Sequence, residues 1–192
     1  MLQGNTNEGR VSLDPVPEGW SQALGALEMG LAHRIDLCFE TAWWTKLESS
    51  PTFVHGKGEA FPVWWTPSPG KATCLTGWVG GPRAMAVSGK TIEQLIPLAL
   101  QSASSIFGVP CATLARSLRA AYSYDWTRDP FSRGAYSYGG VGAGQAREVL
   151  GRPVRDTVYL TGEALATEGH NATVPGALST GLQTADVLLH GS

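Results

Sequence analysis

The 192-residue sequence has no excess of either charge, no block of basic residues and no long hydrophobic run. Lysine and arginine together number 14, and aspartate and glutamate number 16, so the net charge at pH 7 is −2. Nucleic acids and anionic membrane surfaces attract proteins with basic patches. A membrane-spanning helix needs roughly 20 consecutive apolar residues. We therefore expect neither a nucleic acid nor a membrane as a partner.

Cysteine is also scarce, with only Cys38, Cys74 and Cys111, widely spaced and without a CxxC pair. An odd number of separated cysteines in apolar surroundings favours buried free thiols in a reducing compartment. The N-terminal stretch MLQGNTNEGR is polar and does not read as a signal peptide. We expect three buried free thiols, no bound metal and a cytoplasmic location.

Complete nucleotide-binding loops are absent as well. The segment SGKT at residues 88–91 resembles the end of a phosphate-binding loop, but that motif requires a glycine where Ala84 stands. The segment GGVGAGQA at residues 139–146 resembles a dinucleotide fingerprint, but the required third glycine is replaced by Gln145. These 192 residues therefore hold no nucleotide-binding βα turn of their own.

Periodicity predicts both strands and helices. Residues 34–40 alternate, with Ile35, Leu37 and Phe39 on one face, which is typical of a strand. Residues 91–107 form the clearest helix, because Thr91 and Gln94 match a capping box. The remaining predictions are a short helix ending at Gly30, short strands and loops over 41–70, a strand over 72–81, extended structure over 111–126, turns over 129–145, a short helix and turn over 146–156, and a strand over 156–162.

The C-terminal segment combines an acid with a helix start. Glu163 follows the predicted strand, and a helix is expected to begin near Gly176. The first N–H groups of a helix lack partners inside it, so a helix start favours anionic or polar ligands. One face of the predicted helix is apolar and consists of Leu178, Leu182, Ala185, Leu188 and Leu189.

Four segments together resemble a known family. LEMGLAHRIDLCFETAWW, GAYSYGGVGAG, TVYLTGEA and ATVPGALSTGLQTAD are similar, in sequence and order, to the C-terminal part of flavin-dependent amine oxidases, the group of monoamine and polyamine oxidases. The resemblance runs from about Pro15 to Leu189. In that family a glycine-rich N-terminal part and this C-terminal part bind FAD between them. The resemblance implies that the C-terminal stretch of predicted strand, Glu163 and helix is half of a flavin site.

The resemblance also implies which residues contact FAD. Glu163 would accept hydrogen bonds from ribityl or ribose hydroxyls. The positive end of the helix dipole would favour negative charge on a reduced flavin. Gly176 and Ala177 would let a flat ring approach the backbone, and Pro175 suits a helix start. The full set of expected cofactor-binding residues is Gly162, Glu163, Thr173, Val174, Pro175, Gly176 and Ala177.

Three further residues are expected near the reacting atoms. Arg34 stands where many members carry a lysine that holds a water at the flavin, and arginine cannot act as a neutral proton acceptor. Tyr136 matches one wall of an aromatic pair around the substrate amine, while the other wall falls at Thr173. Trp126 resembles a tryptophan near the flavin. Ala135 replaces the cysteine of covalently flavinylated relatives, so we expect non-covalent FAD.

The expected fold is α/β, with a mixed sheet. Residues 1–124 would form a substrate-domain segment, and residues 125–192 a C-terminal FAD-binding segment that is incomplete without a GxGxxG unit. The expected function is amine oxidation by hydride transfer from an amine C–H to flavin N5, giving an imine. A second chain or a homodimer would supply the remaining part. The alternative is a truncated or split non-catalytic module that acts as a binding or assembly subunit without flavin.

Overall fold

A computed structural model of the chain describes residues 2, 8–48 and 51–191. It contains two compact units, one of residues 31–128 and one that joins residues 1–30 to residues 129–192. This division differs from the expected segments 1–124 and 125–192, because strand β1 (Leu27–Gly30) pairs with strand β7 (Tyr136–Gly139). Among the described residues no helix has the length and apolar character needed to cross a membrane.

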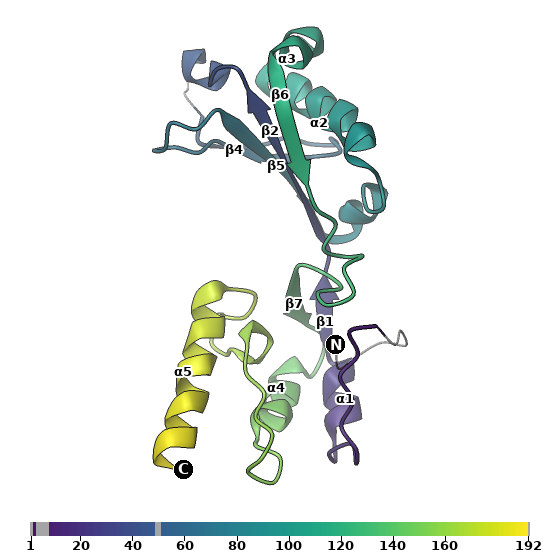
Figure 1. The fold of residues 1–192 in the computed structure, drawn as a ribbon, viewed down its shortest axis with the longest axis vertical. Helices are drawn as coiled ribbons and strands as arrows, with labels where there is room; N and C mark the ends of the chain where they lie inside the picture. The colour runs from purple at the N-terminus through teal and green to yellow at the C-terminus, as the bar shows by residue number, and fades with distance from the viewer. Residues whose placement is uncertain (1, 3–7, 49–50, 192) are drawn as a thin grey trace. The chain divides into compact units, whose positions relative to one another are not determined.

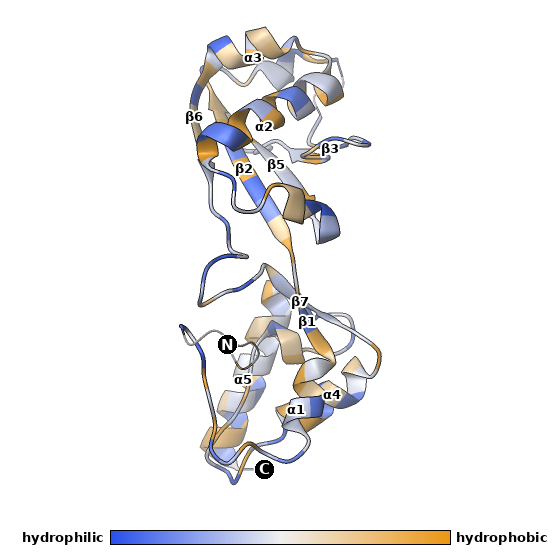
Figure 2. Ribbon diagram, turned by 90° about the vertical axis from the view of Figure 1, so that its right-hand side faces the viewer, coloured by the Kyte–Doolittle hydropathy of each residue, from blue (hydrophilic) through white to orange (hydrophobic). Residues whose placement is uncertain are grey.

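The unit of residues 31–128 is built on a five-stranded antiparallel sheet (Figure 1). In strand β2 (Ala32–Phe39), Ile35, Leu37 and Phe39 are buried on one face, as their alternation predicts. Figure 2 shows hydrophilic and hydrophobic bands following one another along this strand. In spatial order the strands are β3 (Phe53–His55), β4 (Val63–Trp65), β5 (Cys74–Gly80), β2 (Ala32–Phe39) and β6 (Leu118–Ser123).

Helices cover one face of this sheet. Helix α2 (Ile92–Phe107) has the predicted capping box, in which Gln94 Oε1 accepts the Thr91 N–H, and it ends at Gly108 with φ 69°. Its buried side chains pack against the buried strand residues in one core, together with Leu114 of α3 (Cys111–Ser117). Short 3-10 turns complete the unit at η1 (Trp43–Lys46) and η2 (Gly81–Ala86).

The prediction for residues 111–126 was wrong in its first half. Residues 111–117 are helical rather than extended, and the strand begins only at Leu118. The helix is seven residues long and follows Pro110, whose fixed φ suits a helix start. Burial of Leu114 in the core stabilises a turn of helix that is too short for its periodicity to be read from the sequence.

The second unit has a small two-stranded sheet at one end, with its helices extending away from the sheet (Figure 1). Its elements are α1 (Trp20–Gly25), β1 (Leu27–Gly30), β7 (Tyr136–Gly139), α4 (Ala143–Gly151), η3 (Glu163–Leu165) and α5 (Val174–His190). A separate core of Trp20, Ala23, Leu27, Ala146 and Leu150 holds α1 and α4 together. The fold is therefore mixed α/β, as predicted.

Three expectations for this unit were wrong. The N-terminal helix ends at Gly25, and residues up to Gly30 form strand β1 instead. The segment 129–145, expected to be turns, contains strand β7, which is the partner of β1. The predicted strand 156–162 does not form, because the described residues offer it no neighbouring strand beyond one bridge between Val154 and Val158.

The expectation of three free thiols was also wrong. Cys38 and Cys74 form a disulfide between β2 and β5, and only Cys111 is free. The two paired residues lie directly opposite each other in the antiparallel register. The pairing of the strands, which the sequence does not reveal, therefore decides which cysteines meet.

Candidate functional site

Two of the predicted site residues line one groove in the unit of residues 31–128. Arg34 projects from β2, and Trp126 lies in the loop that follows β6. The groove has a volume of about 360 Å³ and is lined by Arg34, Asp36, Tyr122, Ser123, Tyr124 and Trp126. The sheet thus brings together two residues that lie 92 positions apart in sequence.

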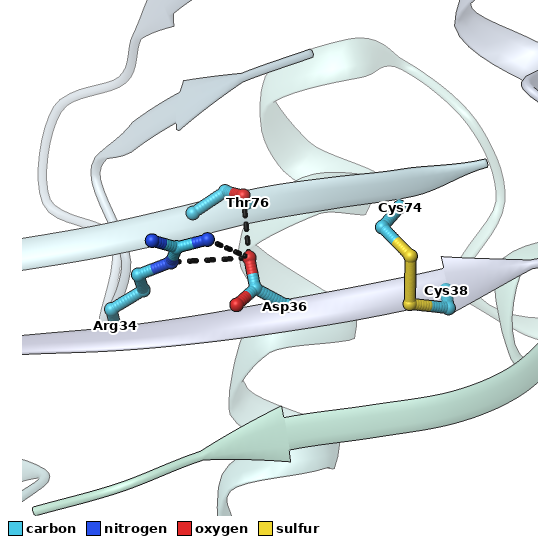
Figure 3. Close-up of a disulfide and its surroundings, with 5 residues drawn as sticks. All are labelled: Arg34, Asp36, Cys38, Cys74 and Thr76. Carbon is cyan, nitrogen blue, oxygen red and sulfur yellow. Dashed lines mark hydrogen bonds and ion pairs between the residues drawn. A yellow bond between two sulfur atoms is a disulfide. The ribbon is translucent and has the colours of Figure 1, made fainter. Parts of the chain in front are cut away.

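Asp36 fixes the position of Arg34 in this groove. The guanidinium donates from Nε and Nη2 to Asp36 Oδ1 at 3.2 and 3.0 Å, and it lies 5.9 Å from the centroid of the Trp65 ring. Thr76 donates its hydroxyl to the same Asp36 oxygen at 2.5 Å (Figure 3). Sequence reasoning missed Asp36 and Thr76, because their contact with Arg34 depends on strand pairing.

Aromatic side chains form one wall of the groove. Tyr124 and Trp126 meet edge to face with ring centroids 4.6 Å apart, and both are more than half exposed. Tyr122 lies opposite Asp36 in the β2–β6 register. Faces of exposed aromatic rings attract cations through the ring quadrupole. The groove therefore combines an aromatic wall with a guanidinium–carboxylate pair.

A buried histidine supports the same groove from beneath. His33 is only 2% exposed, and its Nε2 lies 2.8 Å from Ser123 Oγ. Ser123 Oγ donates to the Arg34 carbonyl at 2.5 Å, so it accepts the Nε2 proton of a neutral His33. In the described part of the chain His33 Nδ1 is buried without a hydrogen-bond partner. The two side chains anchor the backbone of Arg34 to β6.

Electrostatics keep His33 neutral. Burial lowers the pKa of His33, and the nearby Asp125 carboxylate partly offsets this effect. Burial by itself would raise the pKa of Asp125, but hydrogen bonds from the Gly89 N–H and the Ser88 hydroxyl, with the field of His33, leave it lowered. Sequence reasoning did not identify this cluster.

The lowered His33 pKa predicts a stability loss in mild acid. Below pH of about 6.5 the unfolded chain protonates His33 while the folded chain resists protonation, so stability falls as the pH drops toward the folded-state pKa. Urea unfolding of the chain at pH 7.5, 6.5 and 5.5 should show this decline. His33→Gln, which can still bond Ser123 but does not titrate, should show a shallower decline. An equal decline in both proteins would contradict the prediction.

In the unit of residues 1–30 and 129–192, the Glu163 carboxylate is held by the chain itself. Its Oε1 accepts the Ser137 N–H at 2.8 Å, and its Oε2 accepts the Ser137 hydroxyl and the Ala172 N–H, each at 2.7 Å. Glu163 lies in the 3-10 turn η3 and not at the end of a strand, which corrects the expectation. It ties β7 to the loop before α5. A carboxylate has about four lone-pair directions, so one remains for a ligand.

The start of α5 is more fully capped than expected. Thr173 is the N-cap, and its Oγ1 accepts the Gly176 N–H at 3.0 Å. Pro175 lies in the first turn and has no N–H. The Val174 N–H has no partner among the described residues, and the side chain of Val174 is 83% exposed. Of the first-turn N–H groups that were expected to be free, only that of Val174 remains among the described residues.

Gly176 is required by the packing of the chain itself. A Cβ at this position would lie 2.0 Å from the His170 carbonyl oxygen and 2.9 Å from the Ala166 Cβ. Gly176 therefore permits a close approach of the chain's own loop. Three other predicted residues lie in the same unit. Gly162 has φ 135°, and its N–H donates a hydrogen bond to the Thr180 hydroxyl. Ala177 follows Gly176 in α5, and Tyr136 is partly exposed on β7.

The family of this chain follows from a comparison of its sequence with known protein families. Residues 4–189 match the family described as flavin containing amine oxidoreductase. The chain belongs to this family. The resemblance to flavin-dependent amine oxidases is thereby confirmed across nearly the whole chain.

Relatives of this flavin amine oxidoreductase chain are considerably longer. Lysine-specific histone demethylase 1 homolog 3 of Arabidopsis thaliana is 30% identical over 187 residues, which are 93% of this chain and 11% of that protein. Possible lysine-specific histone demethylase 1 of Drosophila melanogaster is 28% identical over 89% of this chain and 20% of its own length. The chain therefore spans only about a tenth to a fifth of the length of these two relatives.

Solved structures share the fold. A putrescine oxidase variant superimposes with a TM-score of 0.79 at 21% identity, over 95% of this chain and 40% of that one. Cyclohexylamine oxidase from Brevibacterium oxydans superimposes with a TM-score of 0.75 at 18% identity, over 94% of this chain and 40% of that one. At these identities the superpositions show a shared fold.

The residues at the start of α5 fit one end of a flavin. The unpartnered Val174 N–H and the remaining lone-pair direction of Glu163 Oε1 offer one donor and one acceptor to a polar ligand edge. The described residues contain no complete GxGxxG loop for the phosphates, because Gln145 replaces its third glycine. The start of α5 therefore offers one donor and one acceptor that fit a polar cofactor edge.

Proposed function

We propose that this chain is the C-terminal portion of an FAD-dependent amine oxidoreductase that converts an amine to an imine. The match of residues 4–189 to the family carries the proposal. When bound, FAD supplies the acceptor for a hydride from the carbon next to the amine nitrogen. Ala135, where covalently flavinylated relatives have cysteine, supports non-covalent binding.

In this proposal the residues of the second unit position the cofactor. The Val174 N–H donates to the polar edge of the ring, and Thr173 keeps the first turn of α5 in place. Glu163 holds the loop before α5 through the Ala172 N–H, and its free lone pair accepts a ribityl hydroxyl. Gly162, Pro175, Gly176 and Ala177 shape the backbone around these groups.

In this proposal the residues of the groove contact the amine substrate. Arg34 remains protonated and, clamped by Asp36, provides a fixed positive charge rather than a proton acceptor. Trp126, with Tyr124 packed on its edge, offers an aromatic wall to the ammonium or alkyl part of an amine. Tyr136, on β7 of the unit of residues 1–30 and 129–192, is proposed as an aromatic contact within that unit. The relatives named for putrescine and cyclohexylamine are consistent with an amine as the substrate.

The exposed face of α5 is proposed to pack against the dinucleotide-binding part of the protein, which lies outside these 192 residues. Val174, Leu178, Leu182 and Leu189 form a stripe along the helix and are 83%, 62%, 62% and 77% exposed. Contiguous apolar surface of this kind marks an interface. The stripe begins at the helix start that carries the free Val174 N–H, so the occupant of the stripe would also border the cofactor.

The test joins this chain to the nearest encoded strand–GxGxxG–helix segment, in the same or a neighbouring reading frame. The purified assembly should show a flavin absorption band that survives removal of excess FAD, and an added amine should bleach the band in the absence of oxygen. An assembly that folds but retains no flavin would refute the proposal.

The α5 stripe provides a variant for the same assay. Leu178→Glu combined with Leu182→Glu should leave the melting temperature of the isolated chain within about 2 °C, because surface changes cost about 0.5 kcal/mol or less. The same change should weaken assembly and flavin retention at least tenfold. Gln183→Glu, on an exposed position of the same helix, is the matched control and should assemble normally. Light scattering of the isolated chain tests the homodimer, which would use the stripe instead.

One observation favours a second function, a non-catalytic module that folds without flavin. The Glu163 carboxylate already has three donors within its own unit, so the loop before α5 needs no ligand to satisfy it. A stable complex with the GxGxxG segment that never retains flavin would support this alternative.

A further inference from the structure

The disulfide joins two strands at a position where their side chains approach most closely. The Phe39 N–H donates to the Thr73 carbonyl, which makes residues 39 and 73 a hydrogen-bonded pair. Pairs alternate in an antiparallel ladder, so Cys38 and Cys74 form a non-hydrogen-bonded pair, the type with the shorter Cα–Cα distance. The backbone ladder therefore holds the two sulfurs opposite each other whether or not they are bonded.

The disulfide shares its face of the sheet with the groove. Two and four residues before Cys38 along β2 lie Asp36 and Arg34, and Asp36 is opposite Thr76 on β5. Figure 3 shows the disulfide beside the Arg34–Asp36–Thr76 cluster, on the same pair of strands. The next pair in the ladder after the disulfide, on this face, is the Asp36–Thr76 pair that clamps Arg34.

The disulfide is accessible to a reductant. Both cysteines are only partly buried, and they lie on the face opposite Leu37 and Leu75, which pack in the core under α2. Cys74 is the first residue of β5, and the register of β2 with β6 shifts between Cys38 and Phe39. The bond thus lies at the end of a ladder rather than within the core. Accessible disulfides of this kind are the labile ones.

We propose that Cys38 and Cys74 form a reversible thiol–disulfide site that is opened by a dithiol reductant and that controls the order of the groove. A thiolate of the dithiol attacks one sulfur and forms a mixed disulfide, and its second thiolate then displaces the protein sulfur. The dithiol is oxidised to its disulfide, and Cys38 and Cys74 take up two electrons and two protons as thiols. In a reducing compartment the bond is open, and a disulfide oxidant such as oxidised glutathione closes it by taking up the two electrons and two protons and leaving as two thiols.

Opening the bond acts on the groove through β5. Without the covalent link, the end of β5 at Cys74 is held only by backbone hydrogen bonds, and the Thr76 hydroxyl is less firmly placed on Asp36. Asp36 then holds Arg34 less rigidly. The fold itself persists, because the core on the other face does not include either cysteine. The effect on amine turnover rests on the proposed function, whereas the chemistry of the two cysteines does not.

The experiment has two parts that use the purified 192-residue chain. After oxidation with oxidised glutathione, alkylation under denaturing conditions and mass spectrometry should find one modified cysteine, Cys111, and three after treatment of the native chain with dithiothreitol. Hydrogen exchange should then be about tenfold faster or more in residues 36–39 and 73–76 of the reduced chain, while α2 stays protected. Cys111→Ser should respond like the natural chain, and Cys38→Ser with Cys74→Ser should not respond.

Each result decides the proposal. Three modified cysteines in the oxidised chain would show that no bond forms, and one modified cysteine after native dithiothreitol treatment would show an inert bond. Unchanged hydrogen exchange would remove the link to the groove. If the flavin assembly is active, reduction should raise its KM for the amine at least threefold with little change in kcat. An inactive assembly with a reversible bond would refute the proposed function and leave the thiol–disulfide site standing.

Discussion

Gly176→Ala is expected to destabilise the unit of residues 1–30 and 129–192 by about 3 kcal/mol, near the upper end of overpacking effects. The added Cβ would lie 2.0 Å from the His170 carbonyl oxygen, which belongs to the backbone and cannot rotate away as a side chain could. Either the loop before α5 or the first turn of the helix must shift. Urea unfolding followed by circular dichroism measures the loss.

The same helix contains a matched control. A Cβ at Gly181 would have only Thr161 Oγ1 nearby, at 4.0 Å, so Gly181→Ala meets no obstacle. Alanine in place of glycine inside a helix is expected to stabilise it by about 0.5–1 kcal/mol. Opposite signs for the two substitutions would confirm that the requirement at 176 is steric. Similar small effects at both positions would show that the loop yields easily.

Glu163→Ala is the second change with a large expected effect. It removes the acceptor of the Ser137 N–H, the Ser137 hydroxyl and the Ala172 N–H together. Hydrogen bonds to charged groups contribute about 1.5–3 kcal/mol each, and partial solvation of the freed donors reduces the sum. We expect a loss of about 3 kcal/mol in unfolding free energy and, in the flavin assembly, weaker FAD binding.

Two conservative variants separate the structural effect from the ligand effect. Ser137→Ala removes one donor and leaves the carboxylate in place, so it should cost about 1 kcal/mol and spare FAD affinity. Glu163→Gln retains one oxygen acceptor and should lie between the natural chain and Glu163→Ala in stability. A Glu163→Ala assembly with unchanged FAD affinity would count against a cofactor contact at Glu163.

The elements that were predicted correctly depend on interactions between residues close in sequence, whereas the incorrect predictions depend on distant partners. The alternation in β2, the capping box of α2 and a helix start near Gly176, observed at Val174, were predictable, because each depends on residues within one or two turns or one strand. The strand expected over 156–162 alternates equally well, but it lacks a neighbour to pair with among the described residues. Alternation alone does not make a strand.

The candidate site divides in the same way. The resemblance supplied Arg34, Trp126 and Glu163, and the structure lines one groove with Arg34 and Trp126. Asp36, Thr76 and His33 were missed, because each acts through a partner on another strand or loop. One signal was available for the cysteines, since Cys38 and Cys74 each fall on a predicted strand. Their pairing still required the register.

By itself the sequence determined the family, the mixed α/β class and the helices whose caps and periodicity are local. Only the tertiary structure decided that Cys38 meets Cys74, that Asp36 clamps Arg34, and that Gly176 makes room for the His170 carbonyl. The physical reason is that these contacts join segments whose relative position is fixed by strand register and loop packing. A sequence pattern indicates which face of a strand or helix a residue occupies. Only the folded chain shows which residue of another segment lies opposite it.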